Sequence, residues 1–283
     1  MGTACGGRRG RGPDRAETMI GKTMQHARSQ QRIEQSATWA GSRAHDAYTL
    51  LYMSGGRAFA PGIKEWIVRG LIAALPDLKM EEFFRIKKNW FSEFDCLILA
   101  VESETGQLVA ALASRWHQHE RRPFFLHVTT QWITHRYQLS SLLKHMWAFH
   151  LQMLNRGPFG FPSLWALKTC HPAAFSALRL FARLPGVYFY PDIEAKQHDP
   201  WMADLARQVA SRISLNLKFS ADTGVIRGAS VPAGFYSALP ITGKPKLARY
   251  FREHLSVDDR ILCLLRISDE AAKRRILALL GAS

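Results

Sequence analysis

The polar segment at residues 134–138, THRYQ, is where residue types and spacing first suggest chemistry. It follows the apolar run FFLHVTTQWI and precedes the run LSSLLKHMWAFHLQML. β-Branched and aromatic residues favour a strand for the first run, and leucines near helical spacing favour a helix for the second. The start of a helix leaves backbone N–H groups unpaired, so this junction could bind an anion, with His135 and Arg136 adding positive charge. The alternative is a solvated loop.

Composition limits what else the chain could be. Its 283 residues are 47% hydrophobic and carry a formal net charge of +15, so we expect a folded core and a preference for acidic partners such as nucleic acid or phosphorylated molecules. A solvated basic surface is the plainer explanation of that charge. No apolar run has transmembrane length, and the four cysteines lack CxxC spacing. These features predict a soluble cytoplasmic protein with buried, reduced thiols.

The elements that would position the junction begin after a Gly- and Arg-rich segment at residues 1–43, which we expect to be a disordered basic tail. Periodicity then predicts alternating strands and helices, and residues 117–123, HQHERRP, are expected to be a solvated loop. The predicted strands are 47–54, 96–103, 107–117, 124–133, 163–170 and 186–192. The predicted helices are 61–75, 80–91, 139–154 and 172–184.

Residues 193–283 are predicted to be a C-terminal extension packed on a main domain at 44–192. Helical spacing marks residues 199–215, and ILCLLRI at 261–267 is a candidate strand at the edge of the sheet. The Gly- and Pro-rich loop at 218–243 could cover a substrate cleft or be a surface excursion.

The order strand, helix, helix, three strands, helix, strand, helix, strand resembles that of the GNAT acyltransferase superfamily over about residues 45–192. The resemblance implies an α/β (α+β) fold, with a mixed, mostly antiparallel central sheet flanked by helices. It also implies that the junction corresponds to the family motif Q/R-x-x-G-x-G/A, whose backbone amides hold the pyrophosphate of acetyl-CoA or another acyl-CoA. His135 then takes the Gln/Arg place, Gln138 the first Gly place and Ser140 the last small residue.

The resemblance further implies a set of coenzyme-binding residues. His171-Pro172 matches the dipeptide that opens the family's next helix, and the usual proton-donating Tyr would fall near Ala177 or Leu178, where Ser176 carries the nearest hydroxyl. The coenzyme-binding residues would be His135, Arg136, Tyr137, Gln138, Leu139, Ser140, Ser141 and His171.

Transfer of an acyl group to an amine requires a base, and His127 and Glu102 are the candidates near the expected centre. Each could instead be structural, His127 in the sheet and Glu102 in a hairpin turn. The other histidines lack metal-binding spacing, so no metal site is predicted. Two hypotheses remain: an acyl-CoA-dependent N-acyltransferase acting on an unknown amine, and a catalytically inactive GNAT-shaped binding or scaffold protein whose basic surface attaches to nucleic acid or another acidic partner.

Overall fold

The structure is a computed structural model that describes residues 40–55, 59–119, 122–138, 140–195 and 198–281. Its strands are β1 (Gly41–Ala44), β2 (Tyr48–Ser54), β3 (Cys96–Glu102), β4 (Leu108–His119), β5 (Arg122–Ile133), β6 (Leu164–Thr169), β7 (Val187–Tyr190), β8 (Phe219–Ser220), β9 (Val225–Ile226) and β10 (Arg260–Ile267). Its helices are α2 (Pro61–Ala74), α3 (Met80–Ile86), α4 (Leu142–Arg156), α5 (Pro172–Phe181), α6 (Pro200–Ile213), α7 (Pro245–His254) and α8 (Glu270–Leu280).

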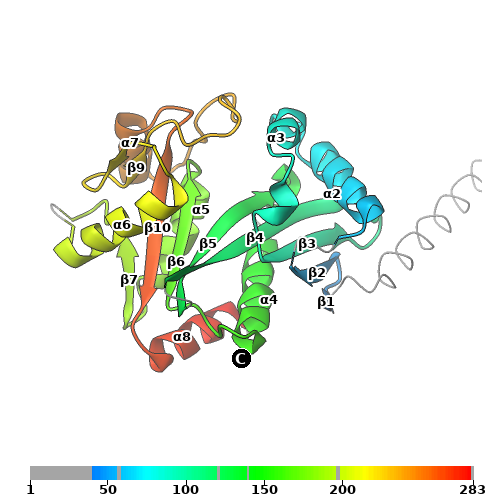
Figure 1. The fold of residues 1–283 in the computed structure, drawn as a ribbon, viewed down its shortest axis with the longest axis horizontal. Helices are drawn as coiled ribbons and strands as arrows, with labels where there is room; N and C mark the ends of the chain where they lie inside the picture. The colour runs from blue at the N-terminus through cyan, green and yellow to red at the C-terminus, as the bar shows by residue number, and fades with distance from the viewer. Residues whose placement is uncertain (1–39, 56–58, 120–121, 139, 196–197, 282–283) are drawn as a thin grey trace, which may run out of the picture.

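The described strands form one sheet in the order β1-β2-β3-β4-β5-β6-β10-β9-β8, with β7 also paired to β10 (Figure 1). Strands β5 and β6 run parallel, and the other pairs are antiparallel. The predicted fold class, a mixed and mostly antiparallel sheet flanked by helices, is therefore confirmed.

Helices cover both faces of this sheet because strand side chains alternate between the faces. On one face α4, α5, α7 and α8 bury their apolar sides in a common core. On the opposite face the helices are separated: α2 and α3 cover the strands from β2 to β4, whereas α6 covers β6 and β10. The second face therefore has two separate apolar clusters.

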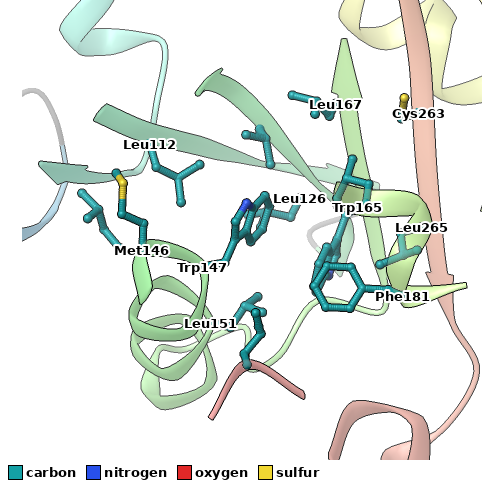
Figure 2. Close-up of a cluster of buried hydrophobic side chains, with 14 of the residues drawn as sticks. Leu112, Leu126, Met146, Trp147, Leu151, Trp165, Leu167, Phe181, Cys263 and Leu265 are labelled. Carbon is teal, nitrogen blue, oxygen red and sulfur yellow. The ribbon is translucent and has the colours of Figure 1, made fainter. Parts of the chain in front are cut away.

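The core beneath α4 is built from aromatic and aliphatic side chains that meet across the sheet (Figure 2). Trp147 of α4 stacks on Trp165 of β6 at a centroid distance of 5.2 Å, and the Trp165 ring also meets Phe181 of α5 edge-on. Each such ring contributes roughly 1.5–3 kcal/mol by burial. The contacts fix α4 and α5 against the sheet, and so fix the chain segments that precede both helices.

Three expectations from the sequence need correction. Residues 117–119 and 122–123 are not loop, because β4 and β5 extend into a long hairpin in which His117 lies opposite Phe125. Strand β10 is not at an edge, because it pairs with β6 on one side and with β7 and β9 on the other. The last residues of the predicted tail form β1, paired with β2.

Other expectations have simpler outcomes. The rest of the predicted tail, residues 1–39, lies outside the described residues. Cys96, Cys170 and Cys263 are free and buried, as expected of residues in apolar runs. Among the helices that the structure describes, none has the length and hydrophobicity of a transmembrane span.

Candidate active site

The central feature of the site is the divergence of the two parallel strands. Strand β5 pairs with β6 only over Leu126–Val128, opposite Trp165–Leu167, and β5 then turns away from β6 (Figure 1). Residues 130–133 of β5 remain paired with β4 on their other side. Their edge toward β6 is unpaired within the described residues.

A cleft of about 1410 Å³ occupies this divergence. Residues 128–134 of β5 and 167–171 at the end of β6 form its two walls. Its lining also includes Ala174 and Ala177 of α5 on one face of the sheet, and His117 of β4 and Arg212 of α6 on the other. The cleft therefore passes between the two strands and connects the two faces of the sheet.

The unpaired edge of β5 can bind an extended ligand. Thr134 donates its N–H to Val109 on the β4 side at 2.9 Å. Because successive residues of a strand point their backbone groups in opposite directions, Gln131 and Ile133 direct theirs toward the cleft. These two residues offer donors and acceptors like those of a neighbouring strand.

The junction after β5 is a short 3-10 turn, His135–Tyr137, and α4 starts only at Leu142. The turn occupies several of the amides that the sequence predicted to be free: Tyr137, Gln138 and Ser140 donate to backbone carbonyls, and Leu142 donates to the Ser140 hydroxyl. This is a correction to the expected helix start. Among the described residues, the amides of His135, Arg136 and Ser141 have no acceptor.

Glu102 holds this turn in place. Its carboxylate accepts hydrogen bonds from the Tyr137 hydroxyl at 2.9 Å and the Thr105 hydroxyl at 2.5 Å, and it forms an ion pair with Arg136 at 2.8 Å. Burial alone would raise the pKa of Glu102, but these donors together lower it. Glu102 does not line the cleft. Its position fits an anchor for the turn better than a base.

His127 lies on the floor of the cleft, where β5 and β6 are still paired. Only 8% of its surface is exposed, and its Nε2 has no hydrogen-bond partner in the described structure. Burial, followed by the charges of Lys168, His117 and Arg115, holds its pKa well below the usual value. His127 is therefore neutral at pH 7, with a buried ring nitrogen that lacks a hydrogen-bond partner among the described residues.

His171 has a structural and a surface role. It caps α5, where its Nδ1 accepts a hydrogen bond from the Ala173 amide at 3.3 Å. Its side chain lines the same cleft, as do those of His135, Arg136 and Gln138. Tyr137, Ser140 and Ser141 do not line the cleft, and Leu139 lies outside the described residues.

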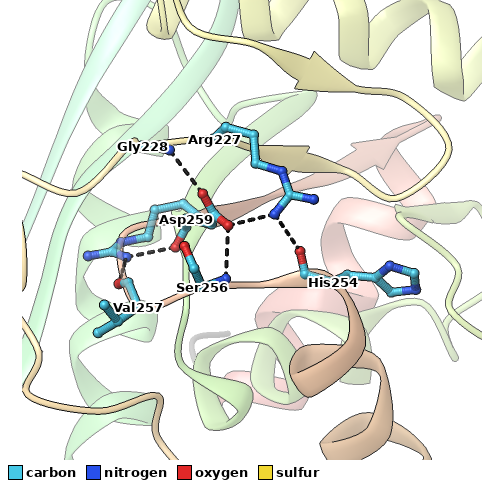
Figure 3. A network of polar contacts seen from close by, with 7 residues as sticks. Arg227, Gly228, His254, Ser256, Val257 and Asp259 are labelled. Carbon is cyan, nitrogen blue, oxygen red and sulfur yellow. Dashed lines mark hydrogen bonds and ion pairs between the residues drawn. The ribbon is translucent and has the colours of Figure 1, made fainter.

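The C-terminal segment contributes one wall of the cleft, including Val231, Phe235 and Tyr236. The loop at 218–243 is therefore part of the cleft, which was one of its two expected roles. Asp259 fixes this loop: its carboxylate accepts hydrogen bonds from the Arg227 guanidinium at 2.6 Å and the Gly228 amide at 3.0 Å (Figure 3). The Ser256 amide donates to the same carboxylate.

Sequence inspection missed several cations of the cleft, among them Arg115 on β4, Lys168 on β6 and Arg212 on α6. Each is a charged residue within a stretch of apolar or small residues. That contrast could have marked each of them as a candidate site residue. Lys168 is the clearest case, because it is the one charge in the buried strand LWALKT. Strand register, which no local pattern reveals, brings these cations together.

No protein-family model and no curated protein matches the chain. Among solved structures, it is similar to the GNAT family N-acetyltransferase YhbS from Escherichia coli in complex with CoA, with 15% identity, a TM-score of 0.33, and coverage of 48% of this chain and 70% of that one. It is also similar to a GNAT-family protein from Bordetella pertussis, with 11% identity, a TM-score of 0.35, and coverage of 53% and 90%. Identities of 15% and 11% do not establish a function, so the proposed function rests on the cleft.

Proposed function

We propose that this protein transfers an acyl group from acyl-coenzyme A to an amine. The observation that carries the proposal is the cleft that runs through the sheet between β5 and β6. Such a passage lets two substrates enter from opposite faces and meet at the divergence of the strands. Holding both reactants in one geometry is a large part of what acyl transfer needs.

The coenzyme would enter from the face that carries α4 and α5. There His135, Arg136, Gln138 and His171 line the cleft, and the free amides of His135 and Arg136 add donors for a phosphate. The backbone edge at Gln131 and Ile133 would pair with the amide groups of the pantetheine arm. Its N–H groups could also polarise the thioester carbonyl.

The acyl transfer itself needs few protein groups. The amine nitrogen forms a bond to the thioester carbon, the carbon–sulfur bond breaks, the amine loses a proton and the thiolate gains one. His127, which is neutral and lines the cleft, is the candidate acceptor of the amine proton, directly or through water. The cationic surroundings help, because they favour the neutral form of an entering amine.

Tyr236 is the candidate proton donor to the thiolate. It is the only tyrosine among the described residues that line the cleft, and burial raises its pKa to about 12, so it carries its proton at neutral pH. The hydroxyl comes from the C-terminal segment, whereas the resemblance to the GNAT superfamily implies a tyrosine on α5. Tyr236→Phe should lower kcat with little effect on coenzyme binding.

Isothermal titration with coenzyme A tests the proposal. We expect micromolar binding, weakened about tenfold or more by Arg136→Ala, since hydrogen bonds to charged groups contribute roughly 1.5–3 kcal/mol. Glu102→Gln should weaken binding less, because it loosens the turn without removing the cation. Arg156→Ala, at the far end of α4, is the matched control. No heat at millimolar coenzyme A would rule the proposal out.

The alternative is a GNAT-shaped binding protein without turnover. Gln138 in the place of a glycine, and the internal hydrogen bonds of the turn, favour it because both restrict the approach of a phosphate to the backbone. Salt-dependent binding of DNA or RNA, together with absent coenzyme binding, would support this alternative.

A further inference from the structure

The half of the cleft on the α6 side of the sheet is a concentrated positive patch. We call Arg115, His117, His127, Lys168 and Arg212 the cationic floor; all five line the cleft, Arg115, Lys168 and Arg212 as its cations and the two histidines as neutral rings. Strand register explains their proximity. Arg115 lies opposite His127, and His127 lies opposite Ala166, two residues before Lys168 on the same strand face. The ring of His117 is 5.6 Å from that of His127.

Acidic side chains do little to neutralise this floor. The carboxylates among the cleft-lining residues of the described structure are Asp77 and Glu93, and Glu93 is already paired with Lys87 at 2.9 Å. Asp95 lies near His117, but its carboxylate accepts a hydrogen bond from the Trp116 amide at 2.8 Å. Glu93 and Asp95 thus offset part of the charge, by raising the pKa values of Lys168 and His117, but among the described residues Arg115, Lys168 and Arg212 form no ion pair.

The floor is also short of hydrogen-bond partners. The buried Nε2 atoms of His117 and His127 are both unpaired in the described structure. Among the described residues, Lys168 donates its hydrogen bonds to two neutral oxygens, the Ile213 carbonyl at 3.2 Å and the Ser214 hydroxyl at 3.3 Å. Buried polar groups are nearly always paired, so unpaired ring nitrogens in two residues that line one cleft point to a bound ligand or water that completes them.

Nearby cations also act on residues of the floor. Burial, followed by the neighbouring charges of Lys87 and Arg260, lowers the pKa of Lys168 to about 8. Burial and the Arg115 charge lower that of His117 to about 4. A bound anion would relieve this repulsion, so the folded protein gains from binding one. A purely cationic amine, such as a polyamine, would be repelled.

We propose that the acceptor is a small amine that also carries an acidic group, a carboxylate or a phosphate, and that the cationic floor binds that group. The proposal rests on the acyltransferase function and adds the class of acceptor. Lys168 would contact the acidic group directly, and His127 would meet the amine end. The acidic group thereby fixes which end of the acceptor faces the thioester.

The test uses two pairs of amines that differ in the acidic group: O-phosphoethanolamine against ethanolamine, and β-alanine against 3-aminopropan-1-ol. Turnover with acetyl-CoA is followed by thiol release, and binding to the coenzyme A-saturated protein by calorimetry. We expect kcat/KM to be about tenfold or more higher for the acidic member of at least one pair, as a charged hydrogen bond would give.

Substitutions test whether the cationic floor causes the preference for the acidic amine. Lys168→Met should lower kcat/KM for the acidic amine about tenfold relative to the neutral amine of the same pair, a ratio in which any effect on His127 cancels, whereas Lys168→Arg should restore most of the preference. Lys273→Met is the matched control, because this partly buried lysine of α8 is paired with Glu270 outside the cleft. Equal use of both members of each pair, or a preference unaffected by Lys168→Met, would overturn the proposal and leave the acyltransferase function standing.

Two further outcomes separate the proposals. If coenzyme A itself displaces O-phosphoethanolamine, the floor belongs to the coenzyme and the inference about the acceptor is wrong. If coenzyme A does not bind but O-phosphoethanolamine binds and Lys168→Met abolishes that binding, the proposed function fails and the anion site remains. If no acidic amine binds at millimolar concentration, the anion site is refuted directly.

Discussion

At the scale of single residues, the protein buries histidines that cannot easily carry charge. His127 has its pKa held well below the usual value by burial and then by the charges of Lys168, His117 and Arg115. His150 is completely buried, and its Nε2 lies 2.9 Å from the Ser114 hydroxyl; burial lowers its pKa to about 3. Both rings stay neutral at pH 7, one in the cleft and one in the core.

These histidines predict how stability depends on pH. Their pKa values are lower in the folded state than the unfolded value near 6.5, so the unfolded chain takes up protons first as the pH falls. The free energy of unfolding should therefore decrease below pH 6.5, by about 1.4 kcal/mol per pH unit for each fully buried histidine. Urea unfolding between pH 6.5 and 5 measures this slope before most carboxylates titrate.

His150→Gln isolates one contribution, because the amide can still bond to Ser114 but does not titrate. Its slope should be smaller than that of the wild type by about 1.4 kcal/mol per pH unit, whatever its stability at pH 7.5. A slope identical to the wild-type slope would show that His150 is protonated in the folded state.

The same scale shows what the sequence could and could not predict of the site. His135, Arg136, Gln138 and His171 could be selected because they flank strand ends, and His127 because it is a titratable residue on the central strand; all of them line the cleft. The cationic floor could not be assembled, since it combines residues from β4, β5, β6 and α6, which are distant in sequence. Their contact depends on strand register, which is set by the hairpin that was expected to be a loop.

At the scale of elements, tight turns control how the C-terminal segment joins the sheet. Gly186 precedes β7 with φ of +80°, and its carbonyl accepts hydrogen bonds from the Ser268 amide and hydroxyl. A Cβ atom there would lie 2.7 Å from the Ser268 hydroxyl and 3.1 Å from the Ala272 Cβ. The turn that starts β7 is thus packed against the start of α8.

Gly186→Ala should therefore destabilise the protein by about 2–4 kcal/mol, by combining left-handed backbone strain with overpacking. Gly160→Ala is the matched control: φ is +68°, but nothing lies within 4 Å of the added Cβ, so only the backbone strain of about 1–2 kcal/mol applies. Urea midpoints of the two variants measure the difference. Equal losses would mean that the contact with Ser268 and Ala272 relaxes without cost.

Local sequence patterns predicted that β10 is a strand, but they did not predict which strands pair with it. The run ILCLLRI was identifiable as a strand because it is short and mostly apolar, with a β-branched Ile at each end, and it forms β10. Its place between β6 and β7 depends on pairings with Leu164–Thr169 and Val187–Tyr190, far away in the chain. A short apolar strand buried on both faces carries no information about its neighbours.

At the scale of the whole molecule, the C-terminal segment is part of the same sheet as the rest. Strand β10 buries Ile261, Cys263 and Leu265 in the core beneath α4 and α5, and buries Leu262 and Leu264 beneath α6. Segment 218–243 closes one wall of the cleft. Folding of the segment and formation of the cleft should therefore be coupled.

This coupling predicts one cooperative unit for the described residues. In native-state hydrogen exchange, the amides of β10 should be as well protected as those of β3, because opening β10 would expose the apolar residues of both cores it joins. A chain ending at residue 192 should fail to fold, since β6 would lose its pairing with β10 along its whole length and Leu164 and Ala166 would lose the cover of α6. The segment would instead be a separate unit if β10 exchanged about a hundredfold faster than β3, which corresponds to a difference of about 2.7 kcal/mol in opening free energy. A folded and monomeric 1–192 fragment would lead to the same conclusion. In that case the wall formed by Phe235 and Tyr236 could move independently of the strands that form the rest of the cleft.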